Sequence, residues 1–206
     1  MSIHIQACPC GMIQANAYIV QAQGREDCVV IDPGDDYEKL RRALGDRRLG
    51  AILLTHGHFD HILGAGALAK ATGAPVYVGA EDVEMLNDAA LNGYADLMGV
   101  RDMPGPALSA RPFGAVLSVC GLDFDILPTP GHSKGSVCLY LKGDGALFSG
   151  DTLFRAGYGR MDLHGGDARA MLKSMKALFA LPPETVVWPG HGDATTIGEE
   201  RARYRL

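Results

Sequence analysis

The sequence predicts an α/β fold of the α+β kind, in which two β-sheets pack together and helices lie on their outside. Two observations predict it: segments typical of strands are grouped in each half of the chain, and helical segments are interspersed among them. The chain has 206 residues, of which 47% are hydrophobic and 21% are charged, a composition typical of a globular protein with a substantial core. We expect one domain over residues 1–206.

The first half of the chain begins with apolar segments that we expect to be strands, at residues 3–7, 16–20 and 28–32. The turn that follows contains Asp36, which can cap a helix running through Leu44. Four more elements are expected: a strand at 51–55, a helix at 62–72, a strand at 76–78 and a helix at 80–86. Residues 87–112 are rich in Gly, Pro and Met and follow no period, so we expect an irregular segment that forms one wall of the substrate site.

The second half repeats this scheme. We expect its strands at residues 116–119, 124–127, 136–141, 146–149 and 185–188, with the first two forming a hairpin. Asp167 can cap a helix that runs to about Phe179, and residues 197–204 are expected to form a last helix. This grouping of strands predicts the second sheet.

Metal-binding side chains crowd the loop that follows the expected strand at 51–55, where His56, His58, Asp60 and His61 lie within six residues. Extended residues two apart point the same way, so His56 and His58 can reach one ion. Asp60 and His61 come after the chain turns and face a neighbouring point. Neutral imidazoles and a carboxylate are typical ligands of zinc or iron, so the loop predicts a metal site rather than four structural residues.

Three more side chains of this kind follow expected strands: His132 in Pro-Gly-His, Asp151 in Ser-Gly-Asp and His191 in Pro-Gly-His-Gly. Five of the seven histidines lie in such positions, and only His4 and His164 do not. Histidines that merely filled the core would not collect at strand ends. The pattern therefore predicts a single site built from both halves of the chain.

Composition also excludes several classes of partner. The net charge is −5 and the cations are scattered, so we expect no nucleic-acid partner. No apolar run is long enough to cross a bilayer and no signal peptide is visible, so we expect no membrane partner. The five cysteines are odd in number and suit reduced thiols in the cytoplasm, although the pair Cys8 and Cys10 could instead bind a metal.

The order His-x-His-x-Asp-His, Pro-Gly-His, Gly-Asp and Pro-Gly-His-Gly resembles that of the metallo-β-lactamase superfamily over essentially the whole chain. The resemblance implies an αββα sandwich with a metal site at the edge that the two sheets share. It implies that one metal is held by three histidines, His56, His58 and His132. It implies that a second is held by Asp60, His61 and His191, with Asp151 bridging the two.

Within the superfamily the chain is most similar to the small glyoxalase II-like (hydroxyacylglutathione hydrolase-like) enzymes, at residues 31–34, 153–162 and 191–199. This resemblance implies a thioesterase that acts on S-acylglutathione or a related small thioester. It also implies two divalent metal ions, zinc first, with iron and manganese as alternatives. Full-length glyoxalase II enzymes carry a C-terminal helical domain that helps bind glutathione. The present sequence ends at Leu206 without room for it, so we expect glutathione to be bound weakly.

Two cations beside one water would supply a bridging hydroxide that attacks the thioester carbonyl. Asp60 and Asp151 are the expected catalytic carboxylates, because Asp60 can orient the nucleophile and accept its proton. Asp32 either accepts a hydrogen bond from a metal-bound histidine or is an ordinary turn residue. Beside the site, Arg160 and Asp162 are expected to pair and brace a loop.

Tyr158 belongs to the expected substrate loop at 154–158. We expect the substrate to be a small-molecule thioester, and the protein to be a monomer or a homodimer.

Three other functions compete with this one. Persulfide dioxygenases of the same fold share all the ligand positions but use one iron, at the positions of His56, His132 and Asp151, so ligand identity does not separate the two activities. Residues 192–196 are more similar to the hydrolases. A metal-dependent nuclease would need a basic surface, and a non-catalytic metal-binding protein would have little use for an open two-metal ligand set.

Overall fold

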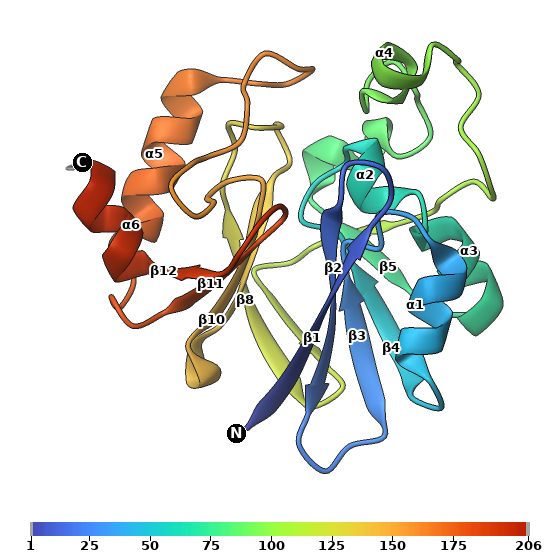
Figure 1. Cartoon of the computed structure of the whole chain (residues 1–206), viewed down its shortest axis with the longest axis horizontal. Coiled ribbons are helices and arrows are strands. Elements are labelled where there is room, and N and C mark those ends of the chain that lie inside the picture. The colour runs from blue at the N-terminus through green and yellow to red at the C-terminus, as the bar shows by residue number, and fades with distance from the viewer. Residues whose placement is uncertain (1, 205–206) are drawn as a thin grey trace.

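The computed structural model describes residues 2–204, and two six-stranded sheets form its centre (Figure 1). The first sheet has the order β1 (Ile3–Cys10), β2 (Ala15–Ala22), β3 (Asp27–Ile31), β4 (Arg48–Leu53), β5 (Val76–Val78) and β6 (Arg111–Pro112). The second has the order β12 (Thr195–Thr196), β11 (Val186–Pro189), β10 (Ala146–Gly150), β9 (Val137–Leu141), β8 (Leu122–Pro128) and β7 (Val116–Val119).

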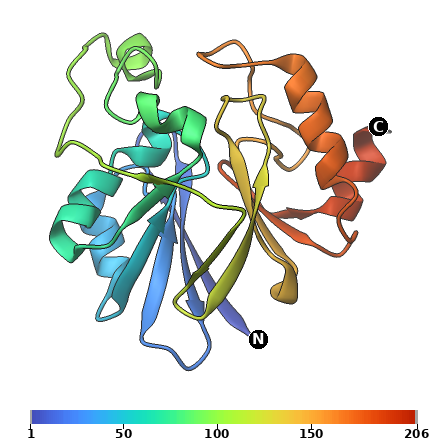
Figure 2. The same ribbon diagram turned by 180° about the vertical axis from the view of Figure 1, so that it is seen from behind.

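Helices cover the outer face of each sheet, as the views from the front and from behind show (Figures 1 and 2). The helical elements are α1 (Tyr37–Leu44), α2 (Phe59–Ile62), α3 (Ala65–Thr72), η1 (Ala80–Met85), α4 (Tyr94–Met98), η2 (Lys142–Asp144), α5 (Ala168–Leu178) and α6 (Ile197–Tyr204). The helices α1 and α3 lie outside the first sheet, and α5 and α6 lie outside the second. The predicted fold class, two packed sheets with helices outside, is therefore confirmed.

Alternation along the strands divides the apolar side chains among three clusters. Because successive strand residues point to opposite faces, Val30 packs toward α1 and α3, whereas Val29 and Ile31 pack between the sheets. The cluster between the sheets includes the fully buried rings of Phe124 and Phe148. Each large apolar side chain buried in this way contributes about 1.5–3 kcal/mol, so the sheets form a stable platform for the loops at their ends.

Parallel pairing brings the ends of several strands to the same edge. Strands β3, β4 and β5 are parallel, as are β10 and β11, so the loops that follow them emerge together. The two sheets are joined at this edge, where Val137 N donates to Thr55 O at 2.8 Å and Asn16 N donates to Gly190 O at 2.7 Å. The loops that carry the predicted ligands therefore meet at one place.

Four local predictions differ from the structure in detail. The helix expected at 62–72 begins only at Ala65, as α3, and Ile62 is instead the last residue of the separate short helix α2. The two helices are separate because Gly64 N donates to Pro33 O at 2.8 Å and draws the chain against the turn after β3. A Cβ at Gly64 would lie 2.8 Å from that oxygen, so no other residue fits there without a shift. Asp36 stands before α1 but does not cap it, since its side chain accepts from Gly11 N.

The helix expected at 80–86 is the 3₁₀ helix η1.

The segment 87–112 is less irregular than expected, because it contains α4 and β6. The predicted cap of α5 is confirmed: Asp167 Oδ1 accepts from Arg169 N and Ala170 N, both at 2.8 Å. Within residues 2–204, no helix has the length and apolar character needed to span a bilayer.

Candidate metal centre

A buried carboxylate holds the start of the loop after β4, at the residue that precedes the first predicted ligand. Asp32, at the end of β3, accepts from Thr55 N at 2.7 Å and from Thr55 Oγ1 at 2.6 Å. Both residues are almost fully buried, and Asp32 has a φ of 48°, in the left-handed region. These bonds fix the start of the ligand loop relative to the neighbouring strand.

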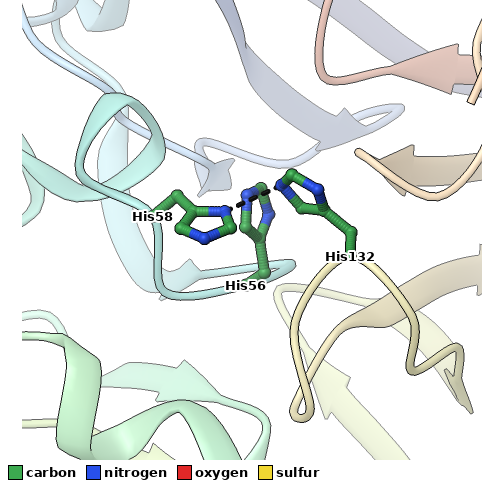
Figure 3. A group of neighbouring side chains, drawn as sticks. All are labelled: His56, His58 and His132. Carbon is green, nitrogen blue, oxygen red and sulfur yellow. Dashed lines mark hydrogen bonds between the residues drawn. The ribbon is translucent and has the colours of Figure 1, made fainter. Parts of the chain in front are cut away.

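Three histidine rings converge at this edge of the sheets (Figure 3). His56 and His58 come from the loop after β4, and His132 comes from the loop between β8 and β9. One ring nitrogen of each lies within 4.8 Å of the others, and His58 Nδ1 is 2.7 Å from His132 Nε2. All three side chains are buried, so the group presents imidazole nitrogens to an interior point.

The outer nitrogens of two of these rings already have partners. His56 Nδ1 lies 3.0 Å from Thr55 Oγ1, and His132 Nδ1 lies 2.7 Å from the carbonyl oxygen of Arg160, to which it can donate. Metal-bound histidines are usually oriented by such a contact on the far nitrogen. The Nε2 atoms of both rings are therefore the ones that face the centre of the group.

A second group consists of Asp60, His61 and His191, whose ligand atoms also lie within 4.8 Å of one another. Asp60 Oδ2 is 3.2 Å from His191 Nε2 and 3.6 Å from His61 Nε2. The far nitrogen of His61, Nδ1, lies 3.0 Å from Asp32 Oδ2. Asp32 thus occupies the place expected of a carboxylate that orients a metal-bound histidine.

Asp151 lies between the two groups. Its Oδ1 is 3.3 Å from His61 Nε2, and its Oδ2 is 3.5 Å from His132 Nε2 and 3.6 Å from His191 Nε2. Asp151 Oδ1 and the Nε2 atoms of His56 and His61 are buried without a hydrogen-bond partner in the part of the chain that the structure describes. Buried polar atoms are nearly always paired, so these atoms fit a site for metal ions, which would be their common partner.

Electrostatics favour cation binding here. Burial lowers the pKa of His56 well below its usual value, and burial together with His132 lowers the pKa of His58 to about 3, so both rings are neutral ligands. Burial opposes charge on His61, but Asp60 and Asp151 outweigh it and raise the pKa of His61. Burial likewise opposes charge on Asp151, yet the neighbouring histidines lower its pKa far below the usual range.

Within residues 2–204, the ion-pair partners of Asp60 and Asp151 are all histidines. Their negative charge is therefore not balanced by a Lys or Arg, and a bound cation would balance it.

A pocket with a volume of about 430 Å³ opens over both groups. Its floor contains His58, Asp60, His132, Asp151 and His191. The apolar part of its wall consists of Ile13, Phe59, Leu97, Phe154 and Leu163. Segment 87–112 contributes Asn92, Gly93, Asp96 and Leu97, so it does reach the pocket as expected.

Of two other predicted site residues, Arg160 lies at the pocket and Tyr158 does not. Arg160 lines the pocket and forms the expected pair with Asp162 through two bonds of 2.7 Å, and both side chains are exposed. Tyr158 does not line the pocket; it packs near Tyr204, with ring centroids 5.9 Å apart, beside α5 and α6. The sequence interpretation missed Ile13, although a Gly11-to-Gln14 turn with two large apolar residues at its tip was a visible signal.

The fold and site are those of a known family. A model of the metallo-β-lactamase superfamily matches residues 10–191, so the chain belongs to this superfamily. Among curated relatives, the probable metallo-hydrolase YqgX of Bacillus subtilis is 38% identical, with 94% of this chain and 92% of the relative covered. The hydroxyacylglutathione hydrolase GloC of Haemophilus influenzae is 29% identical, with 97% and 95% covered.

Solved structures agree. The BLEG-1 B3 metallo-β-lactamase is 39% identical with a TM-score of 0.90, and 97% of each chain is covered. TTHA1623, solved in a di-iron-bound form, is 42% identical with a TM-score of 0.84, and 96% of this chain and 97% of that chain are covered. ETHE1 from Myxococcus xanthus is 29% identical with a TM-score of 0.74, and 96% and 81% are covered.

Proposed function

We propose that this protein is a metal-dependent hydrolase that holds two divalent ions and cleaves thioesters. The observation that carries the proposal is the position of Asp151, which contacts residues of both ligand groups. A carboxylate in this position can bridge two ions about 3.5–4 Å apart, the spacing of two-metal hydrolytic sites. The likeness to YqgX and to the di-iron form of TTHA1623 supports a metal-dependent enzyme of this kind.

The proposed ligands divide between the two ions. One ion is assigned to His56, His58 and His132, and the other to Asp60, His61 and His191, with Asp151 shared. Zinc is our first choice of metal, with iron and manganese as alternatives, because imidazole and carboxylate ligands suit all three.

Two bound ions would lower the pKa of a water between them to around neutrality and stabilise negative charge on the substrate's carbonyl oxygen. The protein's own side chains orient the water and the metal ligands. Asp60 lines the pocket, and His61 and His191 lower its pKa despite burial, so its carboxylate is ionised and can accept a hydrogen bond that orients a water. Asp32 holds His61 in orientation through Nδ1. A thiolate leaves readily and needs little help from an acid.

The pocket wall supports a substrate whose thiol part is apolar or neutral. Ile13, Leu97 and Phe154 offer apolar surface, and Arg160, which also lines the pocket, is already paired with Asp162. Glutathione carries two carboxylates, and each charge-assisted contact that it lacks costs about 1.5–3 kcal/mol. We therefore expect weak saturation with glutathione thioesters, although the likeness to GloC supports thioester chemistry.

Two alternatives rest on specific observations. The contact of Asp151 with His132 and the likeness to ETHE1 are compatible with the first alternative, a persulfide dioxygenase with one iron held by His56, His132 and Asp151. The likeness to BLEG-1 favours hydrolysis of a β-lactam amide by the same two-metal chemistry. Both can be tested on the same sample as the thioesterase.

The test is to measure metal content and then assay one preparation on four substrates: S-lactoylglutathione, a simpler acyl thioester, a glutathione persulfide with oxygen uptake, and a chromogenic β-lactam. We expect two ions per chain, saturable hydrolysis of the simpler thioester and a higher KM for S-lactoylglutathione. Persulfide-dependent oxygen uptake with one iron per chain would replace the proposal with the dioxygenase. Turnover of the β-lactam alone would replace it with the lactamase.

The proposal also covers the location of the protein in the cell and its oligomeric state. We propose a cytoplasmic protein, supported by five buried, free cysteines, which suit a reducing compartment. We expect a monomer or homodimer whose partner is the small-molecule substrate, with no nucleic-acid or membrane partner.

A further inference from the structure

We propose that Asp82 is a positioning residue that holds together the two loops of the three-histidine group, and thereby sets the affinity of that group for its metal. The inference rests on the proposed metal centre but assigns a role to a residue outside the ligand set and outside the pocket. Asp82 lies in η1, more than twenty residues from the nearest ligand in sequence, and its side chain is fully buried.

The carboxylate of Asp82 contacts both loops at once. Its Oδ2 accepts from Gly57 N at 2.9 Å and from Ser133 Oγ at 2.6 Å, and its Oδ1 accepts from Gly135 N at 2.7 Å. Gly57 stands between His56 and His58, and Ser133 directly follows His132. One side chain therefore connects the backbone segments that carry all three histidines.

The packing around Asp82 leaves little freedom for these loops to move. A Cβ at Gly57 would lie 2.9 Å from Met85 Cβ, and a Cβ at Gly135 would lie 2.6 Å from Asp82 N. A Cβ at Gly79 would lie 1.9 Å from Gly135 O. Three glycines thus permit the close approach of η1 to both loops, and the hydrogen bonds of Asp82 fix the distance between them.

A carboxylate is required at this position because three donors converge on it. Two of them are backbone N–H groups, and an ionised carboxylate has enough acceptor sites for all three. Asparagine has one oxygen, and its NH₂ group would face at least one of those donors. Burial raises the pKa of Asp82, and the bonds from Ser133, Gly135 and Gly57 oppose this shift.

The contacts of Asp82 are confined to one of the two groups. Its hydrogen-bond partners flank His56, His58 and His132, whereas His61 of the second group is oriented by Asp32. Loss of Asp82 should therefore weaken one metal position more than the other. A residue that served only the overall stability of the fold would not produce this selectivity.

The test compares Asp82→Asn with a matched control, Asp27→Asn. Asp27 is also a buried carboxylate, bonded to Arg25 at 2.6 Å and to Arg48 at 3.2 Å, but it lies at the opposite end of β3 from the site. Zinc affinities are measured by chelator competition on the metal-free proteins, and the Tm of each metal-free protein is measured in parallel. Wild type is titrated first, which tests the metal centre itself.

For Asp82→Asn we expect the affinity of one of the two zinc positions to fall about 10–100-fold, the usual effect of removing an outer hydrogen-bond partner, with the other position changed much less. Asp27→Asn is expected to lower the Tm and leave both affinities unchanged. Ser133→Ala removes one of the three bonds and should shift the same position in the same direction by a smaller factor. If Asp82→Asn does not fold, the zinc affinities of Ser133→Ala test the role of Asp82 instead.

Equal loss at both positions, or a lower Tm with unchanged zinc binding in Asp82→Asn and Ser133→Ala, would overturn the role of Asp82 and leave the metal centre intact. Absence of zinc binding by wild type would instead contradict the proposed metal centre, and the role of Asp82 with it. The two failures are therefore distinguished by the first titration.

Discussion

The floor and the wall of the pocket are built in opposite ways. On the floor, His58 and His132 are buried, and His132 Nδ1 lies 2.7 Å from the carbonyl oxygen of Arg160, which can accept its proton and orient the ring. On the wall, Ile13 and Leu97 are 42% and 52% exposed. Tightly supported groups suit chemistry that depends on fixed geometry, whereas exposed apolar residues suit recognition of a substrate. The comparison predicts that changes to the floor abolish activity and changes to the wall alter selectivity.

The largest effect is expected for Asp151→Asn. A neutral amide removes the negative charge that faces both groups, so affinity for the second ion and most of the activity should be lost while the fold survives. The loss of turnover should exceed the about 10–100-fold typical of an outer hydrogen-bond partner. Metal analysis, steady-state kinetics and circular dichroism check this, with Asp123→Asn, at an exposed position of β8, as the control. Wild-type turnover with both ions bound would refute the bridging role.

A smaller effect is expected for Asp32→Asn. Asparagine tolerates the left-handed backbone at this position, so the change mainly removes the charge that Thr55 and His61 contact. Metal affinity or activity should fall about 10–100-fold, as for other partners of metal-bound histidines. Chelator competition measures the first and kinetics the second. Unchanged values would make Asp32 an ordinary turn residue.

The stability of the metal-free protein should depend on pH through the histidines of the metal centre. The pKa of His58 is lowered to about 3 by burial and His132, and that of His56 is also lowered, chiefly by burial. Between about pH 4 and 6.5 the unfolded chain therefore binds more protons at these rings than the folded protein, and stability rises with pH. Above about pH 6.5 the raised pKa of His61 acts in the opposite direction, because its stabilising contribution is lost as pH rises through the folded value.

Denaturant unfolding of the metal-free protein at a series of pH values tests this dependence. We expect the free energy of unfolding to increase from about pH 4 to 6.5, and the slope to be smaller in His58→Gln. An equal slope in the variant would show that His58 does not keep a low pKa in the folded protein.

The smallest effect is expected on the wall. Leu97→Ala should raise KM for an apolar thioester by at most about tenfold with kcat nearly unchanged, because a half-exposed side chain supplies less binding energy than a buried one. Val116→Ala, an equally exposed position on β7, is the matched control and should change neither constant. A large loss of kcat in Leu97→Ala would contradict the separation of floor and wall.

Local sequence signals predicted the ligand residues and Asp32, but not Asp82. His56, Asp60 and His191 could be recognised because each follows an apolar strand with a Gly nearby. Asp82 could not, because its hydrogen-bond partners are 25 to 53 residues away. The break between α2 and α3 has the same cause, a long-range contact of Gly64 with Pro33.

Helix α4 was missed for another reason. Its five residues are too few to show a helical period, although Gly93 and Gly99, both with positive φ, mark its two ends.

The account is tested most directly by the metal content of the fully loaded protein together with the distance between its ions. Because Asp60, His61 and His191 form a second group beside the three histidines, with Asp151 between them, we predict two ions per chain. Their separation should be about 3.5–4 Å, as in other two-metal hydrolytic sites. X-ray absorption spectroscopy or a crystal structure of the loaded protein measures both quantities. A fully loaded sample with one ion, and with Asp60 and His61 bound only to water, would contradict the account.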